Sequence, residues 1–288
     1  MTSRLAGQLG TFGVWRGTPQ VSPELAAQLE QLGYGAIWLG GSPSADLEIV
    51  DQLLAATTTL AVGTSIVNIW QSDPATVARS FARIEASFPG RFVLGVGAGH
   101  PEATAEYASP YETLAGYVDR LEAARVPLDR VVLAALGSRV LTLAADRTAG
   151  AIPYLVPPEH TRRARQILGP DTLLAPEHKV VLDPDPSSAR ELGSRRVRVP
   201  YLGLVNYTSN LRRLGYTDED LSGGGSDRLI DALVAHGTAE QVGAQLAEHL
   251  GAGADHVCVQ LLTRKDADPV PQYADLARAL GLTPRPGA

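Results

Sequence analysis

Short apolar runs alternate with amphipathic stretches along nearly the whole 288-residue chain, and this alternation constrains the fold most. The runs are rich in Val, Ile and Leu and lack strict polar alternation, which is typical of parallel strands buried on both faces. Eight such strands, each followed by a helix, predict an α/β fold, the (β/α)8 TIM barrel. The predicted strands are residues 9–15, 36–40, 60–67, 92–97, 131–136, 151–156, 179–182 and 256–262.

Helix signals lie between these runs. Ser22-Pro23 and Asp73-Pro74 each place a capping side chain before an N1 proline, and Thr238 opens a capping box. Residues 112–124 and 138–149 are further helical candidates. An open doubly wound sheet is the alternative, but residues 15–19, WRGTP, lack the glycine-rich phosphate loop that such a sheet carries after its first strand.

One region interrupts the single barrel domain of residues 1–288. Residues 184–237 separate the seventh strand from the next helix, although a simple connection takes only a handful of residues. They contain helical patterns at 189–197, 202–214 and 228–236, with a flexible glycine joint at 223–225. An insertion after a barrel strand lies over the mouth, so we expect a lid or a substrate-side wall. The alternative is a structural excursion or an oligomer contact.

Composition excludes several function classes. The net charge of −6 argues against nucleic acid as a partner, and a lone Cys258 excludes an intrachain disulfide or a cysteine-based zinc site. No histidines and acids have metal-ligand spacing, so no metal is expected. No apolar run reaches the length of a signal peptide or a membrane span, which predicts a cytoplasmic protein with no membrane partner. Lys179 starts the seventh run, away from the mouth, which disfavours a lysine-dependent aldolase.

Candidate site residues follow from the rule that barrel active sites lie at the C-terminal ends of the strands. Asn68 follows the third strand, and Gly95, Gly97 and Gly99 leave room for a flat ring or a phosphate, unless they only relieve crowding inside the barrel. His100 is the one histidine expected at the mouth. Structural roles are expected for His178 and His256, and solvated positions for His160, His236 and His249.

A second group of candidates follows the fifth strand. Gly137, Ser138 and Arg139 open a helix, whose free N–H groups suit a phosphate. The alternative is an ordinary N-cap serine beside a solvated arginine. Trp15 ends the first strand and is expected to wall the pocket.

Residues 88–99, FPGRFVLGVGAG, resemble the hallmark of luciferase-like monooxygenases and their coenzyme F420-dependent relatives. Supporting motifs are VGTSI at 62–66, DPA at 73–75, and GTAEQ at 237–241 leading to AGADHV at 252–257. The resemblance implies a (β/α)8 barrel with an insertion after strand seven, which agrees with the prediction above. It also implies a homodimer that acts on a small-molecule substrate.

The resemblance further implies a cofactor, F420 or FMN, with its ring in the barrel mouth. A non-proline cis peptide would support the ring at Ser65-Ile66. The residues implied to contact the cofactor are Trp15, Ser65, Ile66, Asn68, Gly97, Ala98, Gly99, His100, Gly137, Ser138 and Arg139. His100 and Asn68 are the expected catalytic residues.

The implied activity is hydride transfer between F420 and an unidentified organic substrate. Residues 39–43, LGGSP, lack the histidine that many F420-dependent relatives place after strand two. Two alternatives therefore stay open: an FMN-dependent monooxygenase, and a non-catalytic flavin- or deazaflavin-binding protein. In the insertion, Tyr201, Asn206, Tyr207, Asn210 and Tyr216 offer polar aromatic contacts without a recognisable specificity code.

Overall fold

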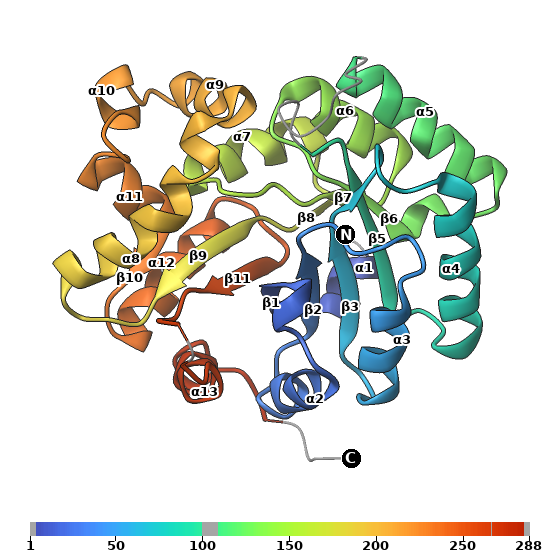
Figure 1. Cartoon of the computed structure of the whole chain (residues 1–288), viewed down its shortest axis with the longest axis horizontal. Coiled ribbons are helices and arrows are strands. Elements are labelled where there is room, and N and C mark those ends of the chain that lie inside the picture. The colour runs from blue at the N-terminus through green and yellow to red at the C-terminus, as the bar shows by residue number, and fades with distance from the viewer. Residues whose placement is uncertain (1–3, 100–108, 266, 285–288) are drawn as a thin grey trace.

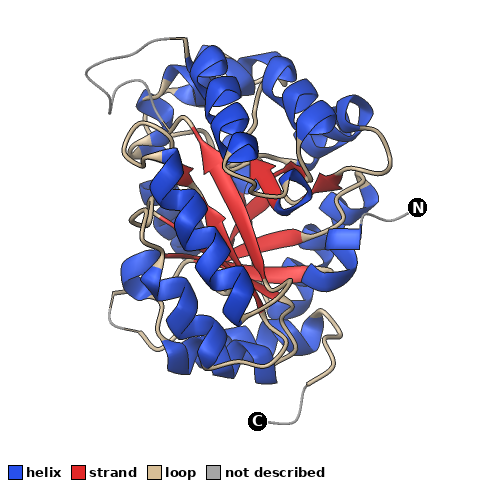
Figure 2. Cartoon of the chain, turned by 90° about the vertical axis from the view of Figure 1, so that its right-hand side faces the viewer, coloured by secondary structure: helices blue, strands red, loops and turns tan. Residues whose placement is uncertain are grey.

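A computed structural model describes residues 4–99, 109–265 and 267–284. Its parallel strands form a curled sheet enclosed by helices (Figures 1 and 2), which confirms the predicted TIM-barrel-like fold. The strands are β1 (Phe12–Gly17), β2 (Ala36–Gly40), β3 (Ala61–Ser65), β4 (Val67–Asn68), β5 (Phe92–Gly97), β6 (Val131–Leu133), β7 (Gly150–Ala151), β8 (Leu173–Leu174), β9 (Glu177–Val181), β10 (Val234–His236) and β11 (Val257–Leu261).

Segment 173–181 joins the two ends of the sheet. On one side, β8 pairs with β7, and the N–H of Glu177 donates to the carbonyl of Pro153 (2.8 Å). On the other side, β9 pairs with β11, and the N–H of Cys258 donates to the carbonyl of Pro176 (2.8 Å). The strands thus curl into a barrel whose carboxyl ends meet at one mouth. β10 adds to the outer end of β9, where residues 234–236 form a strand and not the predicted end of a helix.

The helices lie around the sheet, and those of the insertion gather beside β9 and β10 (Figure 1). Ser22, Asp73 and Thr238 cap their helices as predicted, and Thr238 and Gln241 form the capping box. The helices are α1 (Arg4–Leu9), α2 (Pro23–Gln31), α3 (Glu48–Ala55), α4 (Pro74–Ser87), α5 (Pro110–Ala123), α6 (Ser138–Arg147), α7 (Pro158–Leu168), α8 (Pro186–Arg198), α9 (Val205–Arg213), α10 (Asp218–Leu221), α11 (Asp227–Leu233), α12 (Ala239–Gly251) and α13 (Val270–Ala279). No helix in the described ranges is long and apolar enough to cross a membrane.

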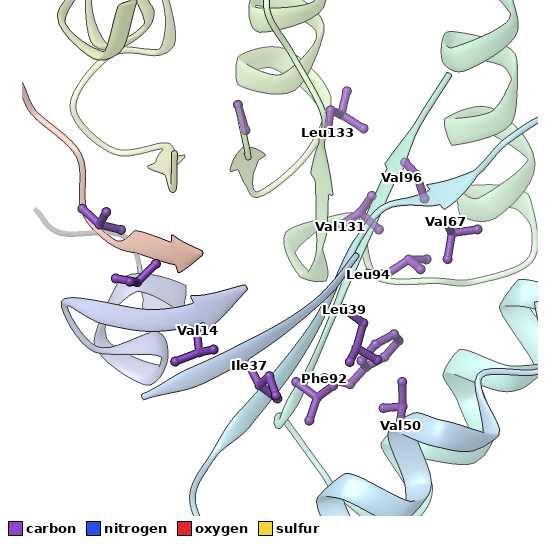
Figure 3. Close-up of a cluster of buried hydrophobic side chains, with 14 of the residues drawn as sticks. Val14, Ile37, Leu39, Val50, Val67, Phe92, Leu94, Val96, Val131 and Leu133 are labelled. Carbon is purple, nitrogen blue, oxygen red and sulfur yellow. The ribbon is translucent and has the colours of Figure 1, made fainter. Parts of the chain in front are cut away.

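Alternate residues of each strand face the helices and form the main core. Ile37 and Leu39 of β2, Leu94 and Val96 of β5, and Val131 of β6 belong to this layer (Figure 3). Successive side chains of a strand point to opposite faces, so the residues between them face the barrel interior. Burial of both faces explains why the strands read as continuous apolar runs.

Trp38 fills much of the barrel interior and is fully buried. It fits because the same face of β3 carries Gly63, where a Cβ would lie 2.3 Å from the Trp38 ring. The indole N–H of Trp38 donates to Nε2 of His256 (3.0 Å), whose Nδ1 lies 2.7 Å from the carbonyl oxygen of Gly10. Both nitrogens of His256 are therefore satisfied inside the barrel.

Helix α1 closes the amino-terminal end of the barrel. Leu5 and Leu9 belong to the same buried cluster as Trp38, Ala36 and Ala61. The predicted strand 9–15 was therefore wrong at its start, because Leu9 ends a helix and β1 begins at Phe12.

Three histidines are buried between the barrel and its outer helices. His249 lies with Nε2 2.9 Å from Nδ1 of His178, and with Nδ1 2.8 Å from the hydroxyl of Thr161. His160 is also buried, so the prediction that His160 and His249 are solvated was wrong. Burial lowers the pKa of His178 to about 4, and it lowers that of His256 inside the barrel to about 4 as well.

We expect Gly63→Ala to lower the free energy of unfolding by about 1–3 kcal/mol, because the new methyl group collides with the Trp38 ring. Gly116→Ala is the matched control. A Cβ there lies 3.9 Å from its nearest neighbour in the middle of α5, so the change should stabilise by about 0.5–1 kcal/mol. Urea unfolding followed by circular dichroism measures both, and equal effects would contradict this packing.

We also expect the free energy of unfolding to fall as the pH falls from 6.5 to 5. The unfolded chain takes up protons at histidines of ordinary pKa, whereas buried His178 and His256 stay neutral until about pH 4. Each histidine contributes a slope of up to about 1.4 kcal/mol per pH unit. Urea titrations at half-unit steps measure the slope, and a flat profile above pH 5, where most carboxylates are ionised, would disprove the expectation.

Candidate functional site

A cavity of about 610 Å³ lies at the carboxyl ends of the strands, within the usual size range of ligand pockets. The ends of β3, β5 and β6 form its first side. Aromatic residues of β1, of the segment after β7 and of the insertion form its second side. Seven of the predicted cofactor residues line it: Trp15, Ser65, Ile66, Asn68, Ala98, Gly99 and Gly137. The sequence prediction thus located the mouth and its first side.

The peptide bond between Ser65 and Ile66 is cis, as the resemblance implied. It lies between β3 and β4, where the strand turns to pair again with β5. Beside it, the hydroxyl of Thr64 donates to the carbonyl of Gly95 (2.8 Å) and accepts from the N–H of Gly95 (2.9 Å). These bonds fix β3 against β5 at the edge of the cavity.

The three glycines in and just after β5 have different roles. A Cβ at Gly95 would lie 1.9 Å from the carbonyl oxygen of Thr64, and one at Gly97 would lie 2.8 Å from the Cβ of Ala134. Both glycines therefore relieve crowding, which was the alternative interpretation of the motif. Gly99 borders the cavity with φ +61°, a conformation that favours glycine.

Asn68 is buried and held in one orientation. Its Oδ1 accepts from the N–H of Trp70 (3.0 Å), and the indole N–H of Trp70 donates to the carbonyl of Ala98 (2.7 Å). Its Nδ2 lies beside Gly99, 2.9 Å from where a Cβ would be. The amide donor of Asn68 is therefore fixed at the cavity wall. His100, the other predicted catalytic residue, lies outside the described residues.

Gly137 is the N-cap of α6, and no side chain caps this helix. It lines the cavity, and a Cβ there would meet nothing within 4 Å. Ser138 and Arg139 are exposed and are not brought to the cavity. The Arg139 guanidinium lies 4.0 Å from the ring centroid of Tyr111 and 3.4 Å from Glu112 Oε1. The helix start, and not the arginine, thus faces the cavity.

Four aromatic side chains form the second side of the cavity. The ring centroids of Trp15 and Tyr154 are 5.2 Å apart, those of Tyr154 and Tyr201 5.3 Å, and those of Tyr201 and Tyr207 5.0 Å. We call these four residues the aromatic wall. Trp15 and Tyr154 come from the barrel, and Tyr201 and Tyr207 from the insertion. Sequence analysis missed Tyr154.

A buried ion pair supports the aromatic wall from within the barrel. Lys179 Nζ lies 3.1 Å from Glu177 Oε1 and 4.0 Å from the ring centroid of Tyr154. Burial raises the pKa of Glu177 and lowers that of Lys179, and their mutual attraction opposes both shifts. The prediction that Lys179 starts the strand was wrong, because β9 starts at Glu177 and places both residues on its inner face. Two charged residues that lie two positions apart in an otherwise apolar strand share one face, and this overlooked pattern predicts a buried pair.

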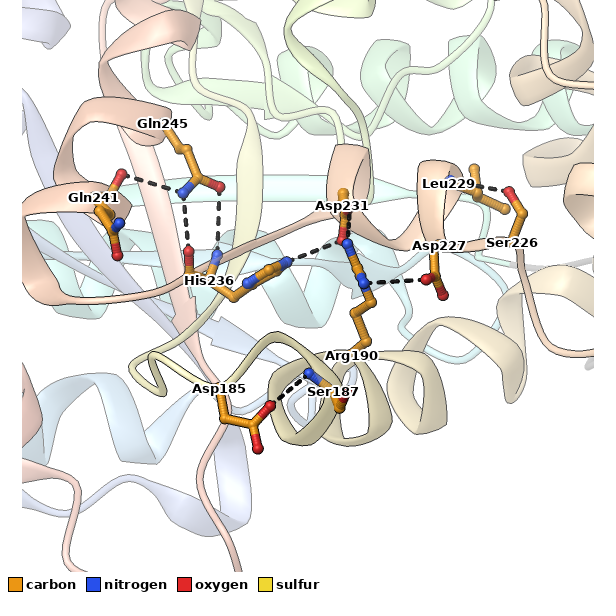
Figure 4. A network of polar contacts seen from close by, with 10 residues as sticks. All are labelled: Asp185, Ser187, Arg190, Ser226, Asp227, Leu229, Asp231, His236, Gln241 and Gln245. Carbon is orange, nitrogen blue, oxygen red and sulfur yellow. Dashed lines mark hydrogen bonds and ion pairs between the residues drawn. The ribbon is translucent and has the colours of Figure 1, made fainter.

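The insertion is held together by a polar network around Arg190 (Figure 4). The guanidinium binds both carboxylate oxygens of Asp231 (2.7 Å each) and lies 3.1 Å from Asp227. Asp231 Oδ1 is 2.9 Å from Nε2 of His236. His236 is half-buried, so the prediction that it is solvated was wrong. Gln245 of α12 donates to the carbonyl of His236 (3.0 Å). The network links α8, α11, β10 and α12.

No three His, Cys, Asp or Glu side chains within the described ranges gather as a metal site. Residues 6–125 match the sequence model of the luciferase-like monooxygenase family. The chain has the luciferase-like fold. The family resemblance inferred from residues 88–99 is thereby confirmed.

Three solved structures share this luciferase-like fold at low sequence identity. An F420-dependent secondary alcohol dehydrogenase with an F420-acetone adduct has a TM-score of 0.70 and 17% identity, covering 94% of this chain and 98% of its own. A coenzyme F420-dependent tetrahydromethanopterin reductase from Methanopyrus kandleri scores 0.63 at 15% identity, covering 94% and 96%. The oxygenating constituent of 3,6-diketocamphane monooxygenase from Pseudomonas putida, in complex with FMN, scores 0.66 at 15% identity, covering 95% and 98%.

One relative is more similar in sequence over a short stretch. The uncharacterized protein YceB of Bacillus subtilis is 37% identical over 87 residues, which cover 28% of this chain and 26% of that protein. The chain therefore spans only about a quarter of this relative's length.

We expect Arg190→Met to loosen the insertion while the barrel stays folded. Losing the paired bonds to Asp231 weakens the contact between α8 and α11, so amide exchange in residues 186–198 and 227–236 should rise about fivefold. Arg195→Met is the matched control, because Arg195 pairs with the exposed Glu191 one turn away on the same helix. Hydrogen–deuterium exchange measures both, and equal exchange in the two variants would contradict the role of Arg190.

Proposed function

We propose that this protein is an oxidoreductase that binds coenzyme F420 in the barrel-mouth cavity and moves a hydride between it and a small organic substrate. The observation that carries the proposal is a cavity with two features. A ligand ring can approach the backbone closely at Ile66 and Gly99, and the uncapped start of α6 borders the cavity at Gly137. Two of the solved structures that share this fold are F420-dependent enzymes, and a third holds FMN.

The residues on the first side of the cavity fit such a cofactor. The N–H groups in the first turn of α6 have no intrahelical partners, and the helix dipole adds positive charge there, so a phosphate group suits Gly137. The ring would lie against Ser65, Ile66 and Gly99, opposite Trp15. When bound, the cofactor supplies the carbon that gains or loses the hydride. The chain's own residues orient both reactants and exclude water.

Asn68 is the proposed contact to a carbonyl oxygen at the reacting centre. Its Oδ1 is engaged by Trp70, which leaves its Nδ2 oriented at the cavity edge. His100 follows Gly99 directly in the sequence and is the proposed proton-exchange partner, because an imidazole titrates near neutral pH. An FMN-dependent monooxygenase on the same barrel is the competing function, and cofactor titration separates the two.

We expect F420 fluorescence to be quenched when the protein is titrated in, and Gly137→Asp to weaken this binding at least tenfold, about 1.4 kcal/mol. The new carboxylate occupies the anion position at the start of α6, and an N-cap aspartate favours the helix, so the variant should fold.

Gly251→Asp is the control, because it adds the same charge at an exposed glycine at the end of α12, where a Cβ meets nothing within 4 Å. Equal affinities of the two variants for F420 would show that the phosphate does not bind at the start of α6. A protein that purifies yellow with FMN and leaves F420 fluorescence unchanged would replace the proposal with the FMN-dependent function.

A further inference from the structure

We infer that the aromatic wall of Trp15, Tyr154, Tyr201 and Tyr207 binds an uncharged organic molecule that contains an aromatic or alicyclic ring. That this molecule is the substrate rests on the proposed function. The chemical class of the ligand rests only on the cavity, through three properties: the charge of its lining, the state of the buried charges behind it, and the packing of its rings.

The described lining of the cavity carries no charged side chain. None of its residues is Asp, Glu, Lys, Arg or His, and its polar side chains are amides, hydroxyls and an indole. A carboxylate or an ammonium group that entered it would lose hydration without gaining an opposite charge, which is costly. The part of the cavity away from the start of α6 therefore favours uncharged molecules over ions.

The nearest buried charges do not alter this selection. Lys179 is 1% exposed, and its ammonium group is paired with Glu177 at 3.1 and 3.3 Å. The rings of Tyr154 and Tyr201 lie 4.0 and 5.4 Å from the same ammonium group, and these rings line the cavity whereas Lys179 and Glu177 do not. The pair is neutral as a whole, so it offers no counter-charge to a ligand anion.

The hydroxyl groups of Tyr154 and Tyr201 are engaged within the protein. Tyr201 donates to the hydroxyl of Tyr154 (3.1 Å), and Tyr154 donates to Oε1 of Gln260 (2.9 Å). These bonds fix the two rings and leave mainly their carbon surfaces for a ligand. The rings of Tyr201 and Tyr207 meet edge-on, with an interplanar angle of 71°. Aromatic surfaces in such an arrangement favour contact with a ring of the ligand over contact with a flexible chain.

Tyr201 and Tyr207 of the aromatic wall also stand apart from the side proposed for the cofactor. Gly99 and Gly137 belong to the ends of β5 and the start of α6, whereas Tyr201 and Tyr207 belong to the insertion. The insertion thus sets the ligand class, and the barrel strands set the cofactor side.

The test uses calorimetry with two probes of matched shape, the neutral ketone 2-acetylnaphthalene and the anion 2-naphthoate, on the F420-saturated protein and on the cofactor-free protein. We expect the ketone to bind at least tenfold more tightly than the anion. Tyr207→Leu should weaken ketone binding about tenfold, whereas Tyr154→Phe, which keeps the ring, should change it less than twofold. Tyr201→Leu serves if Tyr207→Leu does not fold, as judged by thermal unfolding.

Asn206→Lys supplies a gain of function. It introduces an ammonium group at a residue that lines the cavity beside Tyr207, so 2-naphthoate should become the tighter ligand. Equal binding of ketone and anion to the unaltered protein, or ketone binding that is insensitive to Tyr207→Leu and Tyr201→Leu, would overturn the inference. Preference for the ketone in a protein that fails to bind F420 would support the inference and reject the proposed function, so the two failures are distinguishable.

Discussion

The structure depends on how large rings are accommodated inside a narrow barrel. Trp38 lies across the interior because Gly63 of the neighbouring strand has no side chain, and the bond from its indole N–H to His256 removes the cost of burying two polar nitrogens. Trp15 repeats this arrangement nearer the mouth, where a Cβ at Gly40 would lie 1.9 Å from its ring. The glycines thus decide where the interior is filled and where it stays open.

The open region above these rings is the cavity, and two different parts of the chain shape it. The strand ends after β3, β5 and β6 carry small residues and one fixed amide, Asn68, and they leave the start of α6 accessible at Gly137. The insertion adds Tyr201 and Tyr207, whose rings contact Tyr154, and the ring of Tyr201 also lies near the ammonium group of Lys179. Charge and shape are therefore distributed so that an anion is favoured at one end and a neutral ring at the other.

The insertion keeps this position through two kinds of contact. Its apolar residues share a cluster with barrel residues, among them Tyr207 and Leu211 with Leu155 and Leu262. The Arg190 network connects its helices to β10 and α12 at the outer surface. Ring contacts at the mouth and polar contacts at the outer surface thus both hold the insertion against the barrel.

The sequence by itself determined the order of the elements, because caps such as Asp73 and Thr238 and buried strands such as 92–97 are local patterns. With the family resemblance, it also located one side of the cavity. Only the tertiary structure decided that Lys179 faces the interior, that His249 is buried and that Tyr154 meets Tyr201. These facts depend on the register of β9, on helix–sheet packing and on contacts between residues far apart in the chain. A one-residue shift in the register by which a strand pairs with its neighbours reverses the face that each side chain takes, and local sequence does not fix that register.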